Sequence, residues 1–257
     1  MSRSSEIPSS DAAAVEPLGP DDVHIWLIQP ESVTDADVLS RCHQLLCAEE
    51  EERRLRYRFE SLRHDFVVAR ALVRTTLSRY VGLSPADWRF VANDYGRPEI
   101  ESPETARSLR FNLSHTRGLA ACAVAWVDDL GVDVEAMDRQ NSGIPIARRF
   151  FSTSEVDELM SFAESDQSRR FFDYWTLKES YIKARGMGLA IPLDQFSFCI
   201  REAEVPSISF TPPLEDDPAH WQFVQSFPTE RHRMALALKR PRQRTMNVSV
   251  RWATLDG

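Results

Sequence analysis

Hydrophobic and polar positions along the chain alternate with two different periods, and together these predict a mixed α+β protein. Between about Leu62 and Tyr80, and again between Arg170 and about Arg185, apolar residues recur every three or four positions, as in helices that bury one face. Shorter helices are expected from about Glu49, at 144–149 and at 154–162. Short apolar runs between turn residues predict strands at 23–28, 88–91, 111–115, 119–127, 131–135, 196–201, 207–210, 221–226, 234–238 and 248–252.

A weak internal repeat relates the two long helices. An offset of 106 residues superimposes Phe66 on Phe172 and the pair Gly82-Leu83 on Gly188-Leu189, after which each copy has a Pro, an Asp and an aromatic strand. A chance similarity between two amphipathic helices is the alternative explanation. The repeat predicts two similar α/β lobes. We therefore expect three parts: a disordered tail, 1–20, an N-terminal lobe, 21–129, and a C-terminal lobe, 130–257.

The two copies of the repeat differ because the second one carries charge on its helix. At this offset, three apolar positions of the first helix correspond to charged ones in the second: Leu72 to Lys178, Val73 to Glu179 and Leu77 to Lys183. The first helix has the pattern of ordinary core. Charged side chains at matched positions require a reason other than folding, so the segment 175–189 is a candidate functional site.

Composition excludes several classes of protein. Hydrophobic residues make up 42% and charged residues 27%, as in soluble globular proteins, and no apolar run approaches the ~20 residues of a membrane span. The net charge of −8 argues against a nucleic-acid-binding protein. Residues 1–20 show neither a secretory nor a transit signal, and the four cysteines lack metal-ligand spacing. We therefore expect a cytoplasmic protein with reduced thiols, without structural zinc, membrane or nucleic-acid partner.

The strand 131–135, Gly-Val-Asp-Val-Glu, carries two carboxylates on one face. Alternate side chains of a strand share a face, so Val132 and Val134 are expected in the core and Asp133 and Glu135 opposite them. Such oxygen ligands suit Mg²⁺, although a solvated strand end is the simpler alternative. Asp128-Asp129 separates this strand from 119–127, so we expect the two strands to form a hairpin.

The segment 175–189, WTLKESYIKARGMGL, places a negatively charged and a positively charged side chain close together. Glu179 and Lys183 are four residues apart and therefore share a helix face, with Trp175 one turn earlier. A surface ion pair would contribute little, but the flanking aromatic residues leave little room for a solvated helix. The two glycines, Gly186 and Gly188, permit a sharp exit or the close approach of a ligand.

Phosphate-binding groups are expected in the first half of the chain. In Asn-Leu-Ser-His, 112–115, the Ser114 and His115 side chains at a strand end can bind phosphate; a nucleophilic Ser–His pair and a structural histidine are alternatives, and no GxSxG motif is present. One or two arginines could form a phosphate clamp, the rest being a solvated basic face. The candidates are Arg53, Arg54, Arg56, Arg58, Arg63, Arg70, Arg74 and Arg97.

The three motifs, in this order and spacing, resemble those of the 4′-phosphopantetheinyl transferases of the Sfp type. The family pattern has a Ser-His strand end, then G-[VI]-D-[VIL]-E, then W-x-x-K-E-[SA]-x-x-K-x-x-G-x-G-L, and every fixed position of the last two is filled here. The turn Tyr-Gly-Arg-Pro at 95–98 is similar to another family feature. The resemblance covers about 23–238, whereas 1–20 and the segment after Pro241 have no clear counterpart.

The resemblance implies a pseudo-dimeric, monomeric enzyme that binds coenzyme A between its lobes. Such enzymes transfer the 4′-phosphopantetheine arm of coenzyme A to a serine of an apo acyl or peptidyl carrier protein and release 3′,5′-ADP. By resemblance, Asp133, Glu135 and Glu179 hold Mg²⁺, or alternatively Mn²⁺, together with the pyrophosphate that Lys183 also contacts. The expected phosphate contacts are Ser114, His115 and Arg97, with Arg53 at the 3′-phosphate. Glu179 is the first candidate to accept the serine proton, although a metal ligand makes a weaker base.

Carrier docking is expected on the segment 138–151, where Arg139, Arg148 and Arg149 flank Ile144, Ile146 and Phe150. Carrier proteins present an acidic helix, for which a basic-flanked apolar patch is suited; an ordinary amphipathic helix is the alternative. Three rival functions are a non-catalytic module that binds carrier or coenzyme A, a nucleic-acid-binding protein, and another Mg²⁺-dependent phosphotransferase. The complete set of carboxylates opposes the first, and the net charge opposes the second. The lack of a Walker A loop or a kinase glycine loop opposes the third.

Overall fold

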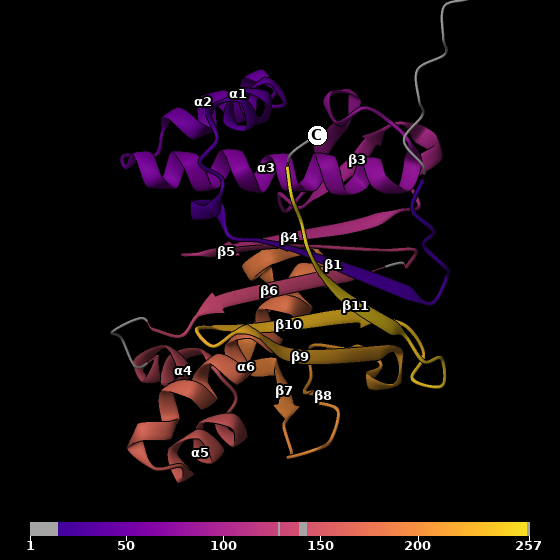
Figure 1. The fold of residues 1–257 in the computed structure, drawn as a ribbon. Helices are drawn as coiled ribbons and strands as arrows, with labels where there is room; N and C mark the ends of the chain where they lie inside the picture. The colour runs from indigo at the N-terminus through magenta and orange to yellow at the C-terminus, as the bar shows by residue number, and fades with distance from the viewer. Residues whose placement is uncertain (1–14, 128, 139–142, 256–257) are drawn as a thin grey trace, which may run out of the picture.

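Two sheets lie side by side at the centre of the protein, and each is covered by one long helix (Figure 1). The computed structural model describes residues 15–127, 129–138 and 143–255. The first sheet has the order β11 (Asn247–Trp252), β1 (Asp22–Ile28), β5 (Leu119–Ala125), β4 (Arg110–Thr116), and the second has the order β6 (Leu130–Ala136), β10 (His232–Lys239), β9 (Trp221–Thr229). Two small hairpins, β2 (Arg89–Ala92) with β3 (Pro98–Ser102) and β7 (Phe196–Cys199) with β8 (Ser207–Phe210), lie beside them.

The helices are distributed in two matching groups. On the first sheet lies α3 (Glu60–Val81), preceded by α1 (Ala36–Gln44) and α2 (Ala48–Leu55). On the second lies α6 (Glu164–Arg185), preceded by α4 (Ile144–Phe150) and α5 (Thr153–Ser161). Each half therefore runs strand, helices, small hairpin, two strands, and its first strand pairs antiparallel with its last. The predicted α+β pseudo-dimer of two lobes is confirmed.

Apolar side chains form three cores: one under α3, one under α6 and one between the two sheets. The third contains Val132 and Val134 of β6 together with the alternate residues Val23, Ile25 and Leu27 of β1. The expectation that these two valines face the core therefore holds, and it leaves Asp133 and Glu135 on the face toward α6.

The repeat is real, but its predicted alignment is wrong by two residues. Both long helices contain 22 residues, and they begin at Glu60 and Glu164, which are 104 positions apart. They end at Gly82 and Gly186, both left-handed, with φ of 68° and 63°. Sequence comparison had matched Gly82 with Gly188, but Gly186 is the residue that takes the left-handed conformation that ends the helix.

With the corrected alignment, the buried charge of Lys178 has a counterpart, Arg74, and a folding reason. Arg74 Nη2 donates to Glu50 Oε2 at 2.8 Å, and Lys178 Nζ lies 2.8 Å from Glu155 Oε2. Each glutamate lies in the first turn of a short helix, where it also accepts the N-cap backbone N–H. In both lobes, therefore, a buried cation on the long helix fixes the start of the preceding helix. The inference that charge at Lys178 indicates function is wrong.

The expected hairpin between 119–127 and 131–135 is also wrong. β5 pairs with β1 and β4, whereas β6 pairs with β10 in the other sheet; Asp128 of the expected turn lies outside the described residues. The actual hairpin joins β4 to β5 through Arg117-Gly118, where Gly118 has φ of 82°. Both sides of β5 are occupied, so β6 cannot pair with it. Periodicity also missed α1 and β3; α1 buries only Val38 and Cys42.

The two ends of the described chain meet at β1. The expected tail, 1–20, lies mostly outside the described residues, and its disorder stays a prediction; within 15–20, the Glu16 carboxylate pairs with Arg251 and the Leu18 carbonyl accepts from Trp126 Nε1. β11 pairs parallel with β1 in the first sheet. The expected C-terminal lobe, 130–257, thus contains one strand that belongs to the sheet of the other lobe.

Removing the buried cation tests the anchoring of the short helices. Lys178→Met is expected to lower the free energy of unfolding by about 3 kcal/mol, because Glu155 keeps a buried charge without its partner. The matched control is Arg56→Met, since Arg56 and its partner Glu52 are 79% and 73% exposed; it should cost under about 0.5 kcal/mol. Urea unfolding measures both, and equal effects would contradict the anchoring role.

Candidate active site

The two lobes are joined by polar side chains of β4 in place of a backbone ladder. Three alternate residues of β4 face β6, and each accepts a backbone N–H from it: Asn112 Oδ1 from Val132 at 2.9 Å, Ser114 Oγ from Val134 at 3.1 Å and Thr116 Oγ1 from Ala136 at 3.3 Å. Buried N–H groups require partners, so these side chains fix the position of β6. The Asn-Leu-Ser-His motif is therefore part of the junction between the lobes.

A glycine lets α6 lie directly on β6. A Cβ atom added to Gly131 would lie 2.0 Å from the Ser180 carbonyl oxygen and 2.4 Å from the Ala184 amide nitrogen, closer than any real contact. Only glycine therefore permits this approach, which places the face of α6 bearing Glu179 and Lys183 against the carboxylates of β6.

Lys183, Ser114 and Asp133 form a closed triangle of hydrogen bonds. Lys183 Nζ donates to Asp133 Oδ1 at 2.7 Å and to Ser114 Oγ at 2.8 Å, and the Ser114 hydroxyl is 3.1 Å from the same carboxylate oxygen. Asp133 is only 4% exposed, and its second oxygen, Oδ2, is buried without a hydrogen-bond partner. A buried carboxylate oxygen of this kind is suited to bind a cation.

Glu135 is oriented by two donors from different elements. Trp175 Nε1 donates to its Oε1 at 3.1 Å, and the Thr116 hydroxyl lies 3.4 Å from Oε2. The Trp175 ring is itself stacked on Phe171 and Phe151. Sequence reasoning placed Trp175 on the right helix face but missed Thr116; the signal was its alternate position after Asn112 and Ser114 on one strand.

Glu179 is the residue whose protonation the site changes most. Burial, and then the negative charge of Asp133, raise its pKa to about 7, although Lys183 acts in the opposite direction; Glu135 adds a smaller upward effect. Three carboxyl groups therefore lie within electrostatic reach of one another, and their mutual repulsion favours either a proton or a cation between them.

The donor set fits a hard divalent cation chemically, because it consists of carboxylate oxygens with one buried oxygen unpaired. Within the described ranges, however, no group of three His, Cys, Asp or Glu side chains is arranged to hold a metal ion. Lys183 is hydrogen-bonded to Asp133 instead. Ion binding at this site therefore requires the lysine or the glutamate side chains to shift.

A basic cluster adjoins the triangle on the first lobe. His115 is exposed, yet its pKa is lowered, first by desolvation from the groups around it and then by the positive charges of Lys183, Arg70 and Arg53. The guanidinium groups of Arg70 and Arg53 lie 5.2 and 6.0 Å from the centre of the Phe66 ring. The predicted Arg53 and His115 thus lie in one positive region, which Arg70 completes.

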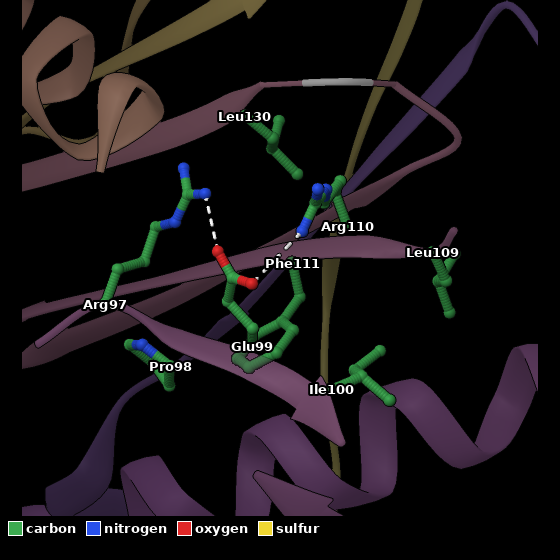
Figure 2. Close-up of a pocket in the computed structure, with 8 residues that line it drawn as sticks. All are labelled: Arg97, Pro98, Glu99, Ile100, Leu109, Arg110, Phe111 and Leu130. Atoms are coloured by element: carbon green, nitrogen blue, oxygen red, sulfur yellow. Dashed lines mark hydrogen bonds and ion pairs between the residues drawn. The ribbon is translucent and has the colours of Figure 1, made fainter. Parts of the chain in front are cut away.

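Arg97 lines a cleft of about 240 Å³ together with Lys183, Glu179 and Gly186. Its Nη2 donates to Glu99 Oε1 at 2.7 Å, and Arg110 approaches the other oxygen of that carboxylate (Figure 2). Its Nη1 donates to the Ala184 carbonyl at 2.7 Å. Both terminal nitrogens therefore have protein partners, and the expected phosphate contact of Arg97 stays a prediction.

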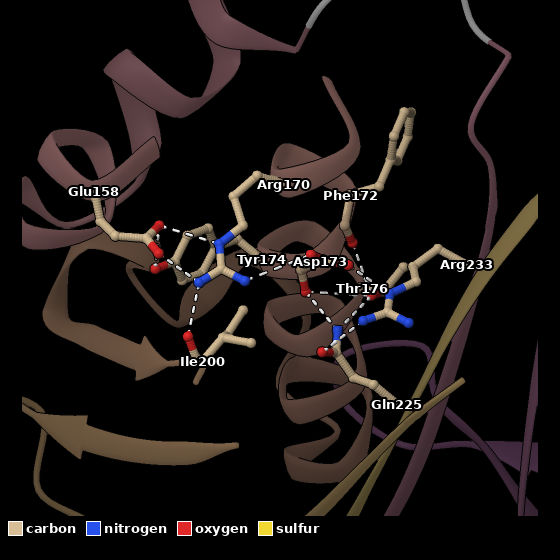
Figure 3. A network of polar contacts seen from close by, with 9 residues as sticks. All are labelled: Glu158, Arg170, Phe172, Asp173, Tyr174, Thr176, Ile200, Gln225 and Arg233. Carbon is tan, nitrogen blue, oxygen red and sulfur yellow. Dashed lines mark hydrogen bonds and ion pairs between the residues drawn. The ribbon is translucent and has the colours of Figure 1, made fainter. Parts of the chain in front are cut away.

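A buried polar network fixes the first half of α6 to its surroundings (Figure 3). Arg170 pairs with Glu158 of α5 and lies 3.6 Å from Asp173, whose other oxygen is 2.6 Å from Arg233 Nε of β10. Gln225 of β9 accepts from Arg233 at 2.9 Å. Burial raises the pKa of Asp173 although three arginines oppose it. Arg233 is the register partner of Glu135, so this network lies next to the site.

Comparison with known proteins decides the family. A profile described as "4′-phosphopantetheinyl transferase superfamily" matches residues 129–237, and one described as "4′-phosphopantetheinyl transferase, N-terminal" matches 34–126. The 4′-phosphopantetheinyl transferase ffp of Bacillus subtilis is 33% identical over 84% of this chain and 91% of its own. The chain belongs to the 4′-phosphopantetheinyl transferase superfamily.

Other relatives of this transferase agree. The 4′-phosphopantetheinyl transferase HetI of Nostoc is 32% identical over 75% of this chain and 80% of its own, and the Sfp enzyme of Bacillus subtilis strain 168 is 33% identical over 61% and 67%. The two profiles named above, which match 34–126 and 129–237, meet near the junction of the lobes.

In the described part of the chain, no helix is long and apolar enough to cross a membrane.

The raised pKa of Glu179 predicts how the stability of the transferase depends on pH. The folded chain holds this proton to about pH 7, against an ordinary value of 4.5, so the associated stability is present below pH 4.5 and is lost as pH rises through about 7. Glu179→Gln, which stays neutral, should therefore exceed the wild type by up to about 3 kcal/mol at pH 8 and match it at pH 4.5. Urea unfolding in chelator-treated buffer measures this, and a difference independent of pH would refute it.

Proposed function

We propose that this transferase moves the 4′-phosphopantetheine arm of coenzyme A to a serine of an apo acyl or peptidyl carrier protein and releases 3′,5′-ADP. The observation that carries the proposal is the meeting of Asp133, Glu135, Glu179 and Lys183 where the two lobes join. The same chain supplies both walls of the cleft, so one copy can form a complete site. We also propose that it acts as a monomer in the cytoplasm.

The carboxylates of Asp133, Glu135 and Glu179 would hold Mg²⁺, or alternatively Mn²⁺. When bound, the ion neutralises the negative charge of the pyrophosphate that is cleaved. The unpaired Oδ2 of Asp133 supports this assignment, as does the raised pKa of Glu179, which results first from burial and then from the negative charge of Asp133. Trp175 and Thr116 would keep the Glu135 carboxylate aimed toward Asp133.

Cationic and hydroxyl groups would hold the phosphates of coenzyme A. Lys183 and Ser114 share the hydrogen-bonded triangle with Asp133 and would bind the pyrophosphate. His115 and Arg53 lie in the positive region beside them, which suits the 3′-phosphate. That region lowers the pKa of His115, so the imidazole is neutral near neutral pH and has one N–H group for a hydrogen bond. A bound phosphate would favour the charged ring, which has two.

The attacking serine belongs to the carrier, so this chain needs only a group that accepts its proton. Glu179 is the best placed, because it lies beside Asp133 and Lys183 and its pKa is about 7 without a bound ion; coordination to a cation would lower that pKa and make Glu179 a weaker base. It would act either directly or through a bound water molecule.

Carrier docking would use α4 and its flanks. Ile146 and Phe150 are both 40% exposed, and the guanidinium group of Arg149 lies 5.0 Å from the centre of the Phe150 ring. Arg148 is exposed beside them, whereas Arg139 lies outside the described residues. The patch combines apolar contact with positive charge, which complements the acidic helix of a carrier protein.

Mass measurement of intact carriers tests the reaction. Several apo acyl and peptidyl carrier proteins are incubated with the transferase, coenzyme A and Mg²⁺, and each substrate should gain one phosphopantetheine arm. Asp133→Ala should abolish the gain, by at least about a thousandfold, because it removes the buried carboxylate oxygens that would hold the cation. Loading by this variant at near wild-type rate would overturn the metal assignment, and no loading of any carrier by the wild type would overturn the function.

The two binding surfaces can be separated by steady-state kinetics. Lys183→Ala should raise KM for coenzyme A by about tenfold or more and leave KM for the carrier within twofold, because the pyrophosphate contact is lost while α4 is unchanged. Arg148→Glu should do the reverse, since charge reversal opposes an acidic helix without reaching the cleft. If Arg148→Glu leaves KM for the carrier unchanged, docking does not occur on α4; if Lys183→Ala leaves the dependence on coenzyme A unchanged, Lys183 is not at the pyrophosphate.

A further inference from the structure

The turn between β2 and β3 is organised by one side chain, Asn93. Its Oδ1 accepts the backbone N–H groups of Tyr95 at 3.0 Å and of Arg97 at 2.9 Å, and its own N–H donates to the Arg97 carbonyl at 2.9 Å. Gly96 completes the turn with φ of 87°. These hydrogen bonds hold the turn in one conformation, and they leave the amide nitrogen Nδ2 of Asn93 available to a partner outside the turn.

This turn of the first lobe caps the end of α6 in the second lobe. Asn93 Nδ2 donates to the Gly186 carbonyl at 2.9 Å, and Arg97 Nη1 donates to the Ala184 carbonyl at 2.7 Å. The last carbonyls of a helix have no partners within the helix, and a cation there also opposes the helix dipole. A Cβ atom on Gly186 would lie 2.5 Å from Arg97 Cζ, so glycine is needed both for the left-handed end and for the guanidinium group.

Arg97 also contacts the strand that carries the metal-site carboxylates. Its Nη1 lies 3.8 Å from Asp129 Oδ1, immediately before β6, while Glu99 fixes its Nη2. One guanidinium group thus connects β3, the start of β6 and the end of α6, and Figure 2 shows it directed away from Pro98 and toward Glu99. These are the elements whose relative positions set the distance between Lys183 and Asp133.

Lys183 lies in the last turn of α6, the part of a helix that frays first without a cap. The polar network around Asp173 holds the first half of this helix, but Asp173 lies ten residues before Lys183. We propose that Asn93 and Arg97 are positioning residues, which cap α6 from the other lobe and hold Lys183 and Glu179 in register with Asp133. Arg97 then acts on coenzyme A through α6 rather than as a phosphate ligand. The inference rests on the proposed function.

The substitution Asn93→Asp isolates the cap. Aspartate keeps the oxygen that organises the turn but replaces the Nδ2 donor with an oxygen that repels the Gly186 carbonyl, and Asn93 does not line the cleft. Arg97→Lys keeps the charge and loses the second arm of the fork. The control is Arg107→Ala, which removes an exposed guanidinium group that bonds locally, to Glu101 and Glu104.

Kinetics, product binding and amide exchange together decide the role. We expect Asn93→Asp and Arg97→Lys to lower kcat by about tenfold or more, since small displacements of catalytic groups have effects of this size. KM for coenzyme A should rise in the same direction as for Lys183→Ala, because a displaced Lys183 loses the pyrophosphate, whereas Kd for 3′,5′-ADP, measured calorimetrically, should change less than threefold, and backbone amides of 183–188 should exchange faster. Arg107→Ala should match the wild type in all four.

Two outcomes would overturn the proposal. If Arg97→Lys weakens 3′,5′-ADP binding tenfold while Asn93→Asp keeps the wild-type kcat, Arg97 is a direct phosphate ligand. If neither variant changes kcat or amide exchange, the turn does not position α6. Failure of the proposed function appears separately, as a wild type that loads no carrier, and the exchange measurement still tests the cap in that case.

Discussion

The rest of the structure depends on the hydrogen bonds between β4 and β6. Polar side chains of β4, and not its backbone, bind the backbone of β6. Three alternate residues of β4, Asn112, Ser114 and Thr116, accept backbone N–H groups of β6, and the two sheets are thereby fixed at one distance. Ser114 illustrates the consequence, because the hydroxyl that satisfies Val134 N–H also contacts Lys183 and Asp133. The Ser114 hydroxyl oxygen therefore has two roles: it joins the lobes, and it belongs to the group that we propose to bind phosphate.

The helix α6 is the second requirement, and it is held at both ends. Gly131 admits it against β6, the network of Arg170, Asp173 and Arg233 fixes its first half, and the turn at 93–97 caps its last carbonyls. Between these supports, like charges are brought together, and the pKa of Glu179 is raised, first by burial and then by repulsion from Asp133. The fold tolerates that repulsion because the surrounding contacts are strong, and a bound cation would relieve it.

The limits of prediction are visible in particular residues. Lys178 and Glu179 are neighbours with equally conspicuous charge, yet Lys178 anchors α5 through Glu155 while Glu179 faces the carboxylates of β6. Periodicity could not separate them, because it reports which side of a helix is covered and not by what. The false hairpin has the same origin: an acidic turn between two apolar strands was visible, but the other partners of β5 were far away in sequence.

The sequence by itself determined the long helices, most strands, the two-lobed repeat and the motifs that indicate the family, because helical periodicity, turn chemistry and motif spacing are local properties. It also placed Asp133 with Glu135 and Glu179 with Lys183, since each pair shares one face of one element. Only the tertiary structure decided that these pairs meet, that Lys183 bonds to Asp133, and that Arg97 reaches the end of α6. Those contacts join residues 50 to 87 positions apart, and they follow from packing at the lobe junction that no local pattern encodes.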